Sequence, residues 1–403
     1  MSVSSRTKIA NESSKKYSSD KMVSDYFALY NQISDNKKIL EIDVNYKFSS
    51  TGKIVYDIKN KASIYGKEVV ACYGRGKKVA EENVYKFGYD IETCVHALLS
   101  RITGYNGCFS YFSTRRLIKI IKEFEPDLIH IHELHAYFVN VSQLLKYIKK
   151  QGIPVVWTFH CEYMYTGKCG HAYDCKGYLS GCGNCPTVNE YPKSLLFDKT
   201  SQMFKLKKQL LSDMNVCIVT PSRWLEDRVR TSYLANKEIL TINNGVDTNV
   251  FHYVKTDELR TELGIKNDRV ALFVSPDISD VKKGIDWIIK LAEDTKDFGI
   301  RYLIIGGGEY TGSVSSNVSF IGSISDKNVL AQYYSLADVY LLCSMKETYS
   351  MTCAEALCCG TPVVGFECGA PETVFEGDYV KFVPYGDYAS LKEEMIMMLE
   401  RCK

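Results

Sequence analysis

Short apolar runs alternate with longer amphipathic stretches along most of this chain. The apolar runs predict strands over residues 39–44, 68–73, 128–133, 155–160, 216–220 and 239–242, and again over 270–274, 302–305, 318–321, 339–343 and 362–366. Helical patterns, such as those over 114–124 and 139–150, separate most of these runs. Strands that alternate with helices are typical of parallel sheets covered by helices on both faces. The pattern therefore predicts an α/β protein with doubly wound sheets.

The alternation occurs twice, which predicts two domains in a chain of 403 residues. We expect a first domain over 38–250 and a second over 251–403, joined near Phe251 after a sharp Asn-Asn-Gly-Val-Asp turn at 243–247. Residues 1–37 are rich in Ser, Lys, Asp and Asn and have few apolar anchors. They predict a disordered or weakly ordered tail, with a short amphipathic helix over 23–33 at most.

Charge and composition limit the classes of partner and the location that we expect for this chain. The net charge is only +2, so no nucleic acid or other large polyanion is expected as a partner. No apolar run is long enough to span a bilayer, and no signal peptide is evident, so we expect a cytoplasmic protein. A basic, apolar stretch over 193–214 predicts a helix that either packs on the sheet, the commoner outcome, or touches the inner face of a membrane.

Residues 161–192 form a cysteine-rich insert within the first domain. Cys169, Cys175, Cys182 and Cys185 follow a C-x5-C-x6-C-x2-C spacing, with Cys161 and His171 as further candidates. The closing C-G-N-C-P resembles a knuckle in which two thiolates converge on one tetrahedral ion, so we expect a structural zinc and no catalytic metal. Disulfides, an iron–sulfur cluster and unliganded thiols in a small core are the alternatives.

Residues 344–372 carry the densest candidate chemistry. A polar loop leaves the strand over 339–343, a helix opens near Thr352, and Glu347 and Glu355 stand in the loop and the helix. Such a junction offers backbone N–H groups and a positive helix end to anionic ligands. The plainer alternative is that Thr352 and Glu355 form a capping box and that Glu347 is a solvated carboxylate. Lys282 and Lys283 also precede a helix, where a cation is unfavourable unless it neutralises an anion.

This stretch resembles the donor site of a known enzyme family. The spacing E-x(7)-E, followed by A-L-C-C-G-T-P-V-V and G-A-P-E, is similar to that of the retaining glycosyltransferases of family 4, which have the GT-B fold of two Rossmann-like domains facing across a cleft. The resemblance implies transfer of a sugar from a nucleotide-sugar donor to a glycan acceptor. In it Glu347 contacts the donor sugar, Glu355 binds the ribose hydroxyls, and Lys282 and Lys283 meet the diphosphate.

Further residues follow from the same resemblance. Gly52 stands in an S-T-G-K-I loop, His160 ends the strand over 155–160 and would face the donor sugar in preference to His132 and His135, and Gly307 lies in a triple glycine. The loop residues Thr348, Ser350 and Met351 complete the expected donor site.

The insert and a following Y-P-K-S are similar to those of bacterial colanic-acid-type enzymes, which implies capsule or exopolysaccharide synthesis and a lipid-linked acceptor. Two departures, Ile278 where the family has arginine and the lack of a final helix crossing back, keep a nucleotide-sugar-binding scaffold open as the alternative. An epimerase or phosphorylase on the same fold is a further alternative.

Overall fold

The computed structural model describes residues 3–33 and 37–401. The chain divides into two compact units, which are treated separately below. The N-unit is Val23–Asn243, and the C-unit combines Met1–Met22 with Asn244–Lys403. None of the helices within the described ranges is long and apolar enough to cross a membrane.

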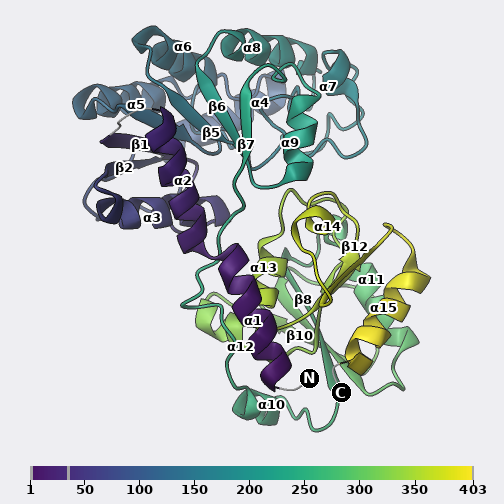
Figure 1. Ribbon diagram of the computed structural model, residues 1–403. Helices are drawn as coiled ribbons and strands as arrows, with labels where there is room; N and C mark the ends of the chain where they lie inside the picture. The colour runs from purple at the N-terminus through teal and green to yellow at the C-terminus, as the bar shows by residue number, and fades with distance from the viewer. Residues whose placement is uncertain (1–2, 34–36, 402–403) are drawn as a thin grey trace. The chain divides into compact units, whose positions relative to one another are not determined.

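The N-unit is built on a seven-stranded sheet in the order β3-β2-β1-β4-β5-β6-β7. Figure 1 labels β1, β2, β5, β6 and β7 of this sheet. Every neighbouring pair of strands is parallel. The strands are β1 (Lys38–Asp43), β2 (Glu68–Tyr73), β3 (Val84–Lys86), β4 (Leu128–Ile131), β5 (Val155–Thr158), β6 (Val216–Thr220) and β7 (Glu238–Thr241). The parallel sheet confirms the predicted doubly wound architecture of the first half.

Helices cover both faces of this sheet. Leu40 and Ile42 of β1 share one core cluster with Leu144 of α6, whereas Ala71 of β2 shares another with Val55 of α3. The helices are α2 (Ser19–Ile33), α3 (Ser50–Lys61), α4 (Asp90–Thr103), α5 (Tyr111–Phe124), α6 (Val141–Gln151), α7 (Gly177–Ser180), α8 (Thr200–Ser212) and α9 (Arg223–Arg230), with a 3-10 turn η1 (Ala62–Tyr65). The predicted basic helix is therefore shorter than 193–214, and its Phe204, Leu210 and Leu211 are buried.

The C-unit repeats the design with six parallel strands in the order β10-β9-β8-β11-β12-β13. They are β8 (Arg269–Asp277), β9 (Ile300–Gly307), β10 (Val318–Gly322), β11 (Val339–Leu342), β12 (Val363–Phe366) and β13 (Val380–Val383). The helices are α1 (Val3–Tyr17), α10 (Asp257–Glu262), α11 (Ile285–Asp294), α12 (Lys327–Leu336), α13 (Met351–Cys358), α14 (Pro371–Val374) and α15 (Tyr388–Arg401), with a 3-10 turn η2 (Val281–Lys283).

Period-two patterning explains the two-sided core of the C-unit. Leu272 of β8 packs in a cluster with residues of α12 and α13, while its neighbour Phe273 packs with residues of α11 and α15. Successive strand residues point to opposite faces, so both faces need helices. In each sheet the strand order reverses beside the first strand, between β1 and β4 and between β8 and β11, and such a switch point is where open α/β sheets bind ligands.

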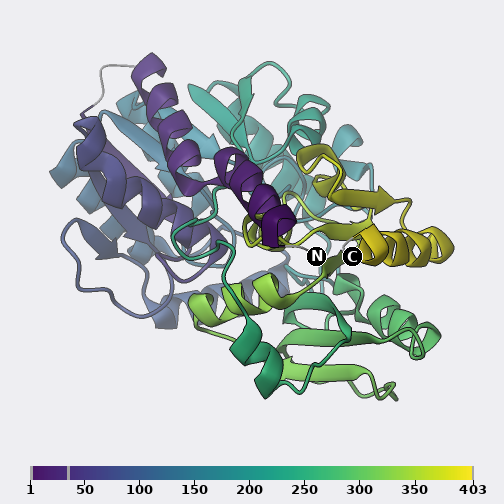
Figure 2. The ribbon, with the colours of Figure 1, turned by 60° about the horizontal axis from the view of Figure 1, so that its bottom comes forward.

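The prediction of a weakly ordered tail over 1–37 was wrong. Both views draw residues 3–33 as two coiled helices, α1 and α2 (Figures 1 and 2). Buried residues recur at helical spacing in α1, and two of them, Arg6 and Ser13, are polar. A count of apolar anchors misses such a face, because Arg6 is buried by pairing with Asp338 (2.9 Å). Residues 1–2 and 34–36 of the predicted tail lie outside the described residues.

The expected domain boundary also changes. The units divide between Asn243 and Asn244 instead of near Phe251, and residues 1–22 join the second unit because α1 packs on α13. The predicted last helix is α15, whose described part ends at Arg401, and residues 402–403 lie outside the described residues.

Candidate functional site

The carboxyl edge of the C-unit sheet brings together the predicted lysines and Glu347. Lys282 and Lys283 lie in η2 after β8, and Glu347 lies in the loop after β11. Lys283 Nζ donates to Glu347 Oε1 at 2.8 Å, and the side chains keep 32% and 20% of their surface exposed. Because β8 and β11 flank the switch point, this ion pair stands where the fold admits a ligand.

Gly284 explains how the lysines reach this position. Its φ is +82°, and a Cβ there would lie 2.1 Å from the carbonyl oxygen of Cys343. The backbone after η2 can therefore lie against the end of β11 only because residue 284 has no side chain. Met345 N also donates to Lys282 O (2.9 Å), which ties the two loops together.

Helix α13 begins at Met351, with Ser350 as its N-cap. Ser350 Oγ accepts from Cys353 N at 3.3 Å, and the residue itself has φ +80°, an uncommon conformation for a side chain that is not glycine. The capping-box alternative is therefore excluded, because Thr352 lies inside the helix and Glu355 in its second turn. Thr348, Ser350 and Met351 form the loop-to-helix junction between the two glutamates.

Glu355 has a partner outside its own helix. Its Oε2 accepts from the hydroxyl of Tyr334 on α12 at 3.0 Å. Burial raises the pKa of the Glu355 carboxyl to about 7, against the opposing effects of Tyr334 and Lys327. This carboxyl therefore changes its charge near neutral pH.

The G-A-P-E segment holds the loop that carries Glu347. Glu347 N donates to Cys368 O (2.9 Å), and Ala370 N donates to Glu347 O (3.1 Å). The carboxylate of Glu372 accepts from the backbone N–H groups of Cys368 and Gly369 at 3.0 and 2.8 Å. Glu372 is thus a residue that fixes the loop.

Gly307 and Ile278 lie at the end of β9 and just after β8. A Cβ on Gly307 would come within 3.0 Å of Ser323 Oγ, so the strand end is closely packed. Ile278 is buried in the core among residues of α11. No cation stands at position 278, and Lys282 and Lys283 are the basic residues that the loop after β8 contributes.

The N-unit has a corresponding edge after β1 and β4. The expected small-residue loop is the first turn of α3, because Ser49 caps the helix by accepting from Gly52 N at 2.9 Å. Thr51 Oγ1 donates to Asp43 Oδ2 at 2.8 Å. Burial raises the pKa of the Asp43 carboxyl to about 7, although the Thr51 hydroxyl opposes that shift.

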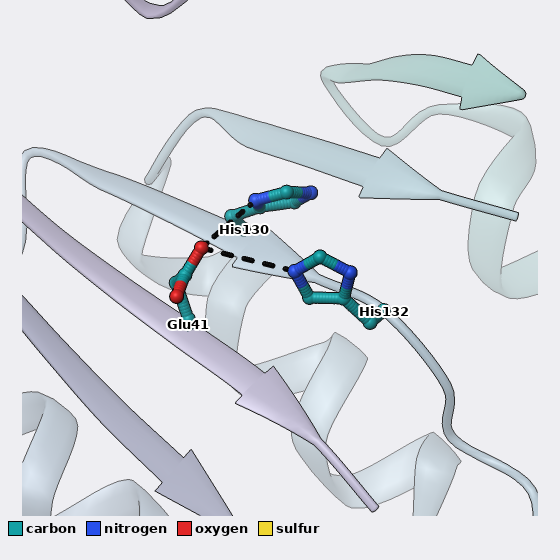
Figure 3. Close-up of side chains that lie close together, drawn as sticks. All are labelled: Glu41, His130 and His132. Atoms are coloured by element: carbon teal, nitrogen blue, oxygen red, sulfur yellow. Dashed lines mark ion pairs between the residues drawn. The ribbon is translucent and has the colours of Figure 1, made fainter. Parts of the chain in front are cut away.

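Histidines from β4 and β5 meet at the same edge. His160 follows β5 and is partly exposed, whereas His132 follows β4 and is buried. His132 Nδ1 and His160 Nε2 are 3.1 Å apart, and the rings are stacked at 10°. Burial lowers the pKa of His160 to about 4, so its imidazole is neutral at pH 7. His130 and Glu41 lie close to His132 (Figure 3). Both are fully buried.

Glu133, His135 and Cys161 form a second polar group at this edge. Glu133 Oε2 contacts His135 Nε2 at 2.9 Å and accepts from Cys161 Sγ at 3.3 Å. Burial would raise the pKa of Glu133, but the charge and hydrogen bond of His135 hold it below its usual value. Burial raises the pKa of the Cys161 thiol to about 11, so this thiol is not an activated nucleophile.

The four cysteines predicted to hold zinc are only partly assembled. Gly167 N donates to Cys182 Sγ at 3.2 Å, Gly177 N donates to Cys175 Sγ at 3.4 Å, and a thiol contact with Cys169 lowers the pKa of Cys185 to about 6. Sets of three or more ligand atoms within 4.8 Å of one another occur twice in the described part of the chain. Neither set includes these cysteines, so zinc stays a prediction.

Sequence reasoning missed Glu41, His130 and Asp43. The signal was present, because Glu41 interrupts the apolar run I-L-E-I, which is predicted to be part of a buried strand. A charged residue inside such a run is buried only with partners. The partners, His130 and His132, stand two positions apart on the neighbouring strand and its end, a match that needs the strand order to be known.

Comparisons with known proteins agree with this architecture. The sequence model described as "Glycosyltransferase Family 4" matches residues 55–250, and the model described as "Glycosyl transferases group 1" matches residues 268–401. Together they cover most of the chain. The chain belongs to glycosyltransferase family 4.

Curated relatives are distant in sequence. The chain is 24% identical over 290 residues to the putative colanic acid biosynthesis glycosyl transferase WcaC of Escherichia coli, covering 69% of this chain and 67% of that protein. It is 25% identical over 175 residues to N-acetyl-alpha-D-glucosaminyl L-malate synthase of Bacillus anthracis, covering 41% of this chain and 45% of that protein. The chain thus spans about two thirds of the first relative and less than half of the second.

Solved structures show the same GT-B fold. A glycosyltransferase from Rickettsia africae matches with a TM-score of 0.62 at 15% identity, covering 91% of this chain and 89% of that one. Alr3699/HepE from Anabaena, solved in complex with UDP-glucose, matches with a TM-score of 0.58 at 16% identity, covering 90% of each chain. The GT-B fold predicted from the sequence is confirmed.

Proposed function

We propose that this family member transfers a sugar from a nucleotide-sugar donor to a glycan acceptor, with retention of the anomeric configuration. The observation that carries the proposal is the Lys283–Glu347 ion pair at the switch point between β8 and β11. A partly exposed ammonium held there by a carboxylate is available to an incoming diphosphate. The UDP-glucose bound by the Anabaena neighbour supports this class of donor.

The proposal gives a role to four of the predicted site residues. Lys283, with Lys282 beside it, neutralises the leaving diphosphate, and the first-turn N–H groups of α13 add to the anion site. Glu347 is released from Lys283 by the phosphates and accepts hydrogen bonds from the donor sugar. Glu355, in its ionised form, accepts from the two ribose hydroxyls.

The N-unit supplies the acceptor side. His160 donates or accepts a hydrogen bond at the donor sugar near the reacting carbon. His160 and Asp43 carry little or no charge. We therefore propose that they assist an oxocarbenium-like transition state by positioning the reactants and not by stabilising its charge. We favour attack by the acceptor on the same face from which the nucleotide leaves, without a covalent intermediate.

A thermal-shift panel of UDP-, GDP-, ADP- and dTDP-sugars tests the donor site. A donor at about a hundred times its dissociation constant should stabilise the fold by roughly 2.7 kcal/mol. Stabilisation by one nucleotide class that disappears in Glu355→Ala, and persists in the matched exposed variant Glu393→Ala, supports the proposal. No shift with any donor contradicts it, and binding without transfer to any acceptor identifies a nucleotide-sugar-binding scaffold instead.

We further propose a lipid-linked acceptor and a peripheral membrane contact in polysaccharide synthesis. The Escherichia coli relative is a putative colanic acid biosynthesis enzyme, which supports this class of pathway. An exposed apolar surface on α4 and α5, including Ile91, Val95 and Phe112, lies beside Arg115 and Arg116, which suits an anionic bilayer. Phe112→Asp should reduce co-sedimentation with phosphatidylglycerol vesicles, whereas Phe298→Asp, at an exposed phenylalanine of the C-unit, should not. Equal binding of the two variants to the vesicles would contradict a membrane contact through this surface.

Zinc remains our proposal for the cysteine insert. The glycine N–H groups that donate to Cys175 and Cys182 are the kind of hydrogen bond that supports thiolates, and two buried lysines, Lys168 and Lys207, would balance their charge. Elemental analysis should find one zinc per chain that is lost in Cys182→Ser and retained in Cys94→Ser, since Cys94 is exposed on α4. Metal-free wild-type protein with unchanged stability in a chelator would contradict the zinc.

A further inference from the structure

Three side chains of different chemistry converge where β4 and β5 end in the N-unit. Glu133 and His135 follow β4, Cys161 follows β5, and the two strands are parallel neighbours. One ligand atom from each side chain lies within 4.8 Å of the other two. Glu133 Oε2 is 2.9 Å from His135 Nε2 and 3.3 Å from Cys161 Sγ. A carboxylate, an imidazole and a thiol therefore meet at one point of the sheet edge.

The spacing of these atoms is close to that of a tetrahedral metal site. Zinc bonds of about 2.0 to 2.3 Å place neighbouring ligand atoms about 3.3 to 3.6 Å apart. The separation between Cys161 and Glu133 already has this value, and the contact between Glu133 and His135 needs to lengthen only slightly. A carboxylate and a thiolate also neutralise a divalent cation together, so the bound ion would bring no net charge into a half-buried site.

The buried Glu41 network differs in the availability of its histidine. In this network, which joins Glu41 to His130, Tyr30 and Thr158, both ring nitrogens of His130 are engaged. Its Nδ1 contacts the Tyr30 hydroxyl at 2.6 Å, and its Nε2 contacts Thr158 Oγ1 at 2.8 Å. A metal needs the lone pair of a ring nitrogen. By contrast, His135 Nδ1 has no hydrogen-bond partner within the described residues, so the ring of His135 is not held by two partners and can give a lone pair to an ion.

The backbone that carries the cluster is held in place. Glu133 N donates to Asp43 Oδ1 at 3.2 Å, which fixes the chain where it leaves β4. Glu162 N donates to Gly170 O at 2.7 Å, which fixes the chain directly after Cys161. Ligands on a backbone that is already ordered lose little freedom when an ion binds.

The cluster is partly open to solvent. His135 keeps 25% of its side-chain surface exposed, and Cys161 is half-buried. Three protein ligands leave the fourth position of a tetrahedral ion open, whereas structural zinc sites use four. Thiolate and imidazole ligands favour zinc-type ions over magnesium and calcium, which prefer oxygen.

We propose that Glu133, His135 and Cys161 bind one divalent transition-metal ion of the zinc type, with one coordination position open. The cluster includes none of the four cysteines of the insert, so this site is separate from the zinc proposed there. Three ligands hold an ion less tightly than four, so the ion exchanges with solvent and the site fills on titration. The site rests on the geometry of the N-unit alone. That an acceptor hydroxyl takes the open position beside His160 rests on the proposed function.

Cobalt(II) titration of the full chain tests the site without any nucleotide sugar. Tetrahedral cobalt with a thiolate ligand gives a charge-transfer band in the near ultraviolet and intense visible bands, and it replaces zinc in such sites. We expect wild type to bind one equivalent of cobalt whose charge-transfer band disappears in Cys161→Ser. Glu133→Gln and His135→Gln should weaken this binding by more than about tenfold.

Two cysteine variants are matched controls. Cys108 is another partly buried thiol of the N-unit, and burial raises its pKa to about 11, as it does for Cys161. Cys182 belongs to the insert. Cys108→Ser and Cys182→Ser should both keep the cobalt equivalent that Cys161→Ser changes.

Three results would overturn the proposal. They are the lack of a cobalt equivalent in folded wild type, equal cobalt spectra and affinities in Cys161→Ser and Cys108→Ser, and loss of the same equivalent in both Cys161→Ser and Cys182→Ser, which would assign the ion to the insert. If Cys161→Ser does not fold, Glu133→Gln and His135→Gln decide the matter, because unchanged cobalt affinity in either refutes the site.

Azide tests the open coordination position. This small anion should shift the visible bands of the wild-type cobalt complex, and an unchanged spectrum would show that the position is closed. Cobalt binding in a protein that fails the donor panel would contradict the proposed function and leave the metal site standing. Donor binding in a protein that binds no cobalt would refute the metal site and leave the proposed function standing.

Discussion

The sheets of the two units have the same strand order around the switch point, but the side chains there differ in charge and exposure. In the C-unit, the edge between β8 and β11 carries a charged pair, Lys283 and Glu347, which remains partly exposed. In the N-unit, the edge between β1 and β4 is backed by Glu41 and His130, which have no exposed surface. The first arrangement can exchange a partner for an anionic ligand, and the second can only hold a geometry. The fold thus fixes where a site lies, and the side chains decide its chemistry.

The two N-terminal helices repeat this contrast. Helix α1 attaches to the C-unit through the buried ion pair of Arg6 with Asp338, supported by Arg6 Nη1 donating to Ala337 O at 2.6 Å. Helix α2 attaches to the N-unit through neutral hydroxyl groups, Tyr26 on Thr158 and Tyr30 on His130. Charge therefore stabilises one attachment, and packing with neutral hydrogen bonds stabilises the other.

Arg6→Ala should have the largest effect on stability. It leaves the buried Asp338 carboxylate without its close partner, and removing one side of a buried pair costs about 3–5 kcal/mol. Tyr30→Phe in α2 removes one hydroxyl and should cost about 1 kcal/mol. Urea unfolding of both variants, with exposed Lys8→Ala as the control for α1, measures the difference. Equal losses in the two variants would show that the attachments do not differ in kind.

Lys283→Ala tests the exchangeable charge of the C-unit. Losing a preorganised cation that meets developing negative charge should lower kcat/KM by about 10²–10³. Lys282→Ala should lower it less, because Lys283 is the lysine that pairs with Glu347 at the switch point. Lys296→Ala, at an exposed lysine of the same unit, is the matched control. If Lys282→Ala lowers kcat/KM as much as Lys283→Ala, the contact with the phosphates is not particular to Lys283.

The sequence predicted the parts of the fold that follow from local patterns. The buried strands and their parallel arrangement emerge from apolar runs such as that of β6, whose bounds agree with the prediction of 216–220. The outer strands β3 and β13 were missed, since β3 has only three residues and Lys381 interrupts the apolar run of β13. Helix α1 was missed for a different reason: its buried face depends on Arg6 finding Asp338, 332 positions away.

The candidate-site residues also fall into two groups, those that a local sequence pattern marks and those that meet only in the folded chain. The Lys283, Glu347 and Glu355 set could be predicted because a family-like spacing marks it in one dimension. The Glu41 network could not, because its members come from α2, β1, β4 and β5 and meet only through strand order. Spacing motifs report residues that a single loop brings together, while buried networks require the topology.

Glu355→Gln should have a smaller effect than Arg6→Ala, seen in the pH dependence of stability. The folded carboxyl keeps its proton up to pH 7, whereas the unfolded chain releases it near its ordinary pKa of about 4.5. The folded state binds more protons in that window, so the free energy of unfolding falls as pH rises through it and levels off above pH 7.

Between pH 5.5 and 8 the contribution of Glu355 is about 2 kcal/mol by this linkage. Asp43 in the N-unit, whose pKa burial also raises to about 7, contributes with the same sign. Histidines with lowered pKa, such as His160, act in the opposite direction below about pH 6.5, so only the difference between wild type and variant is diagnostic. Urea midpoints across this range should decline less steeply in Glu355→Gln, and Asp43→Asn should match it if burial acts equally in both units. A Glu355→Gln profile parallel to wild type would mean that Glu355 is ionised throughout, which would make the C-unit edge fully charged and sharpen its contrast with the N-unit.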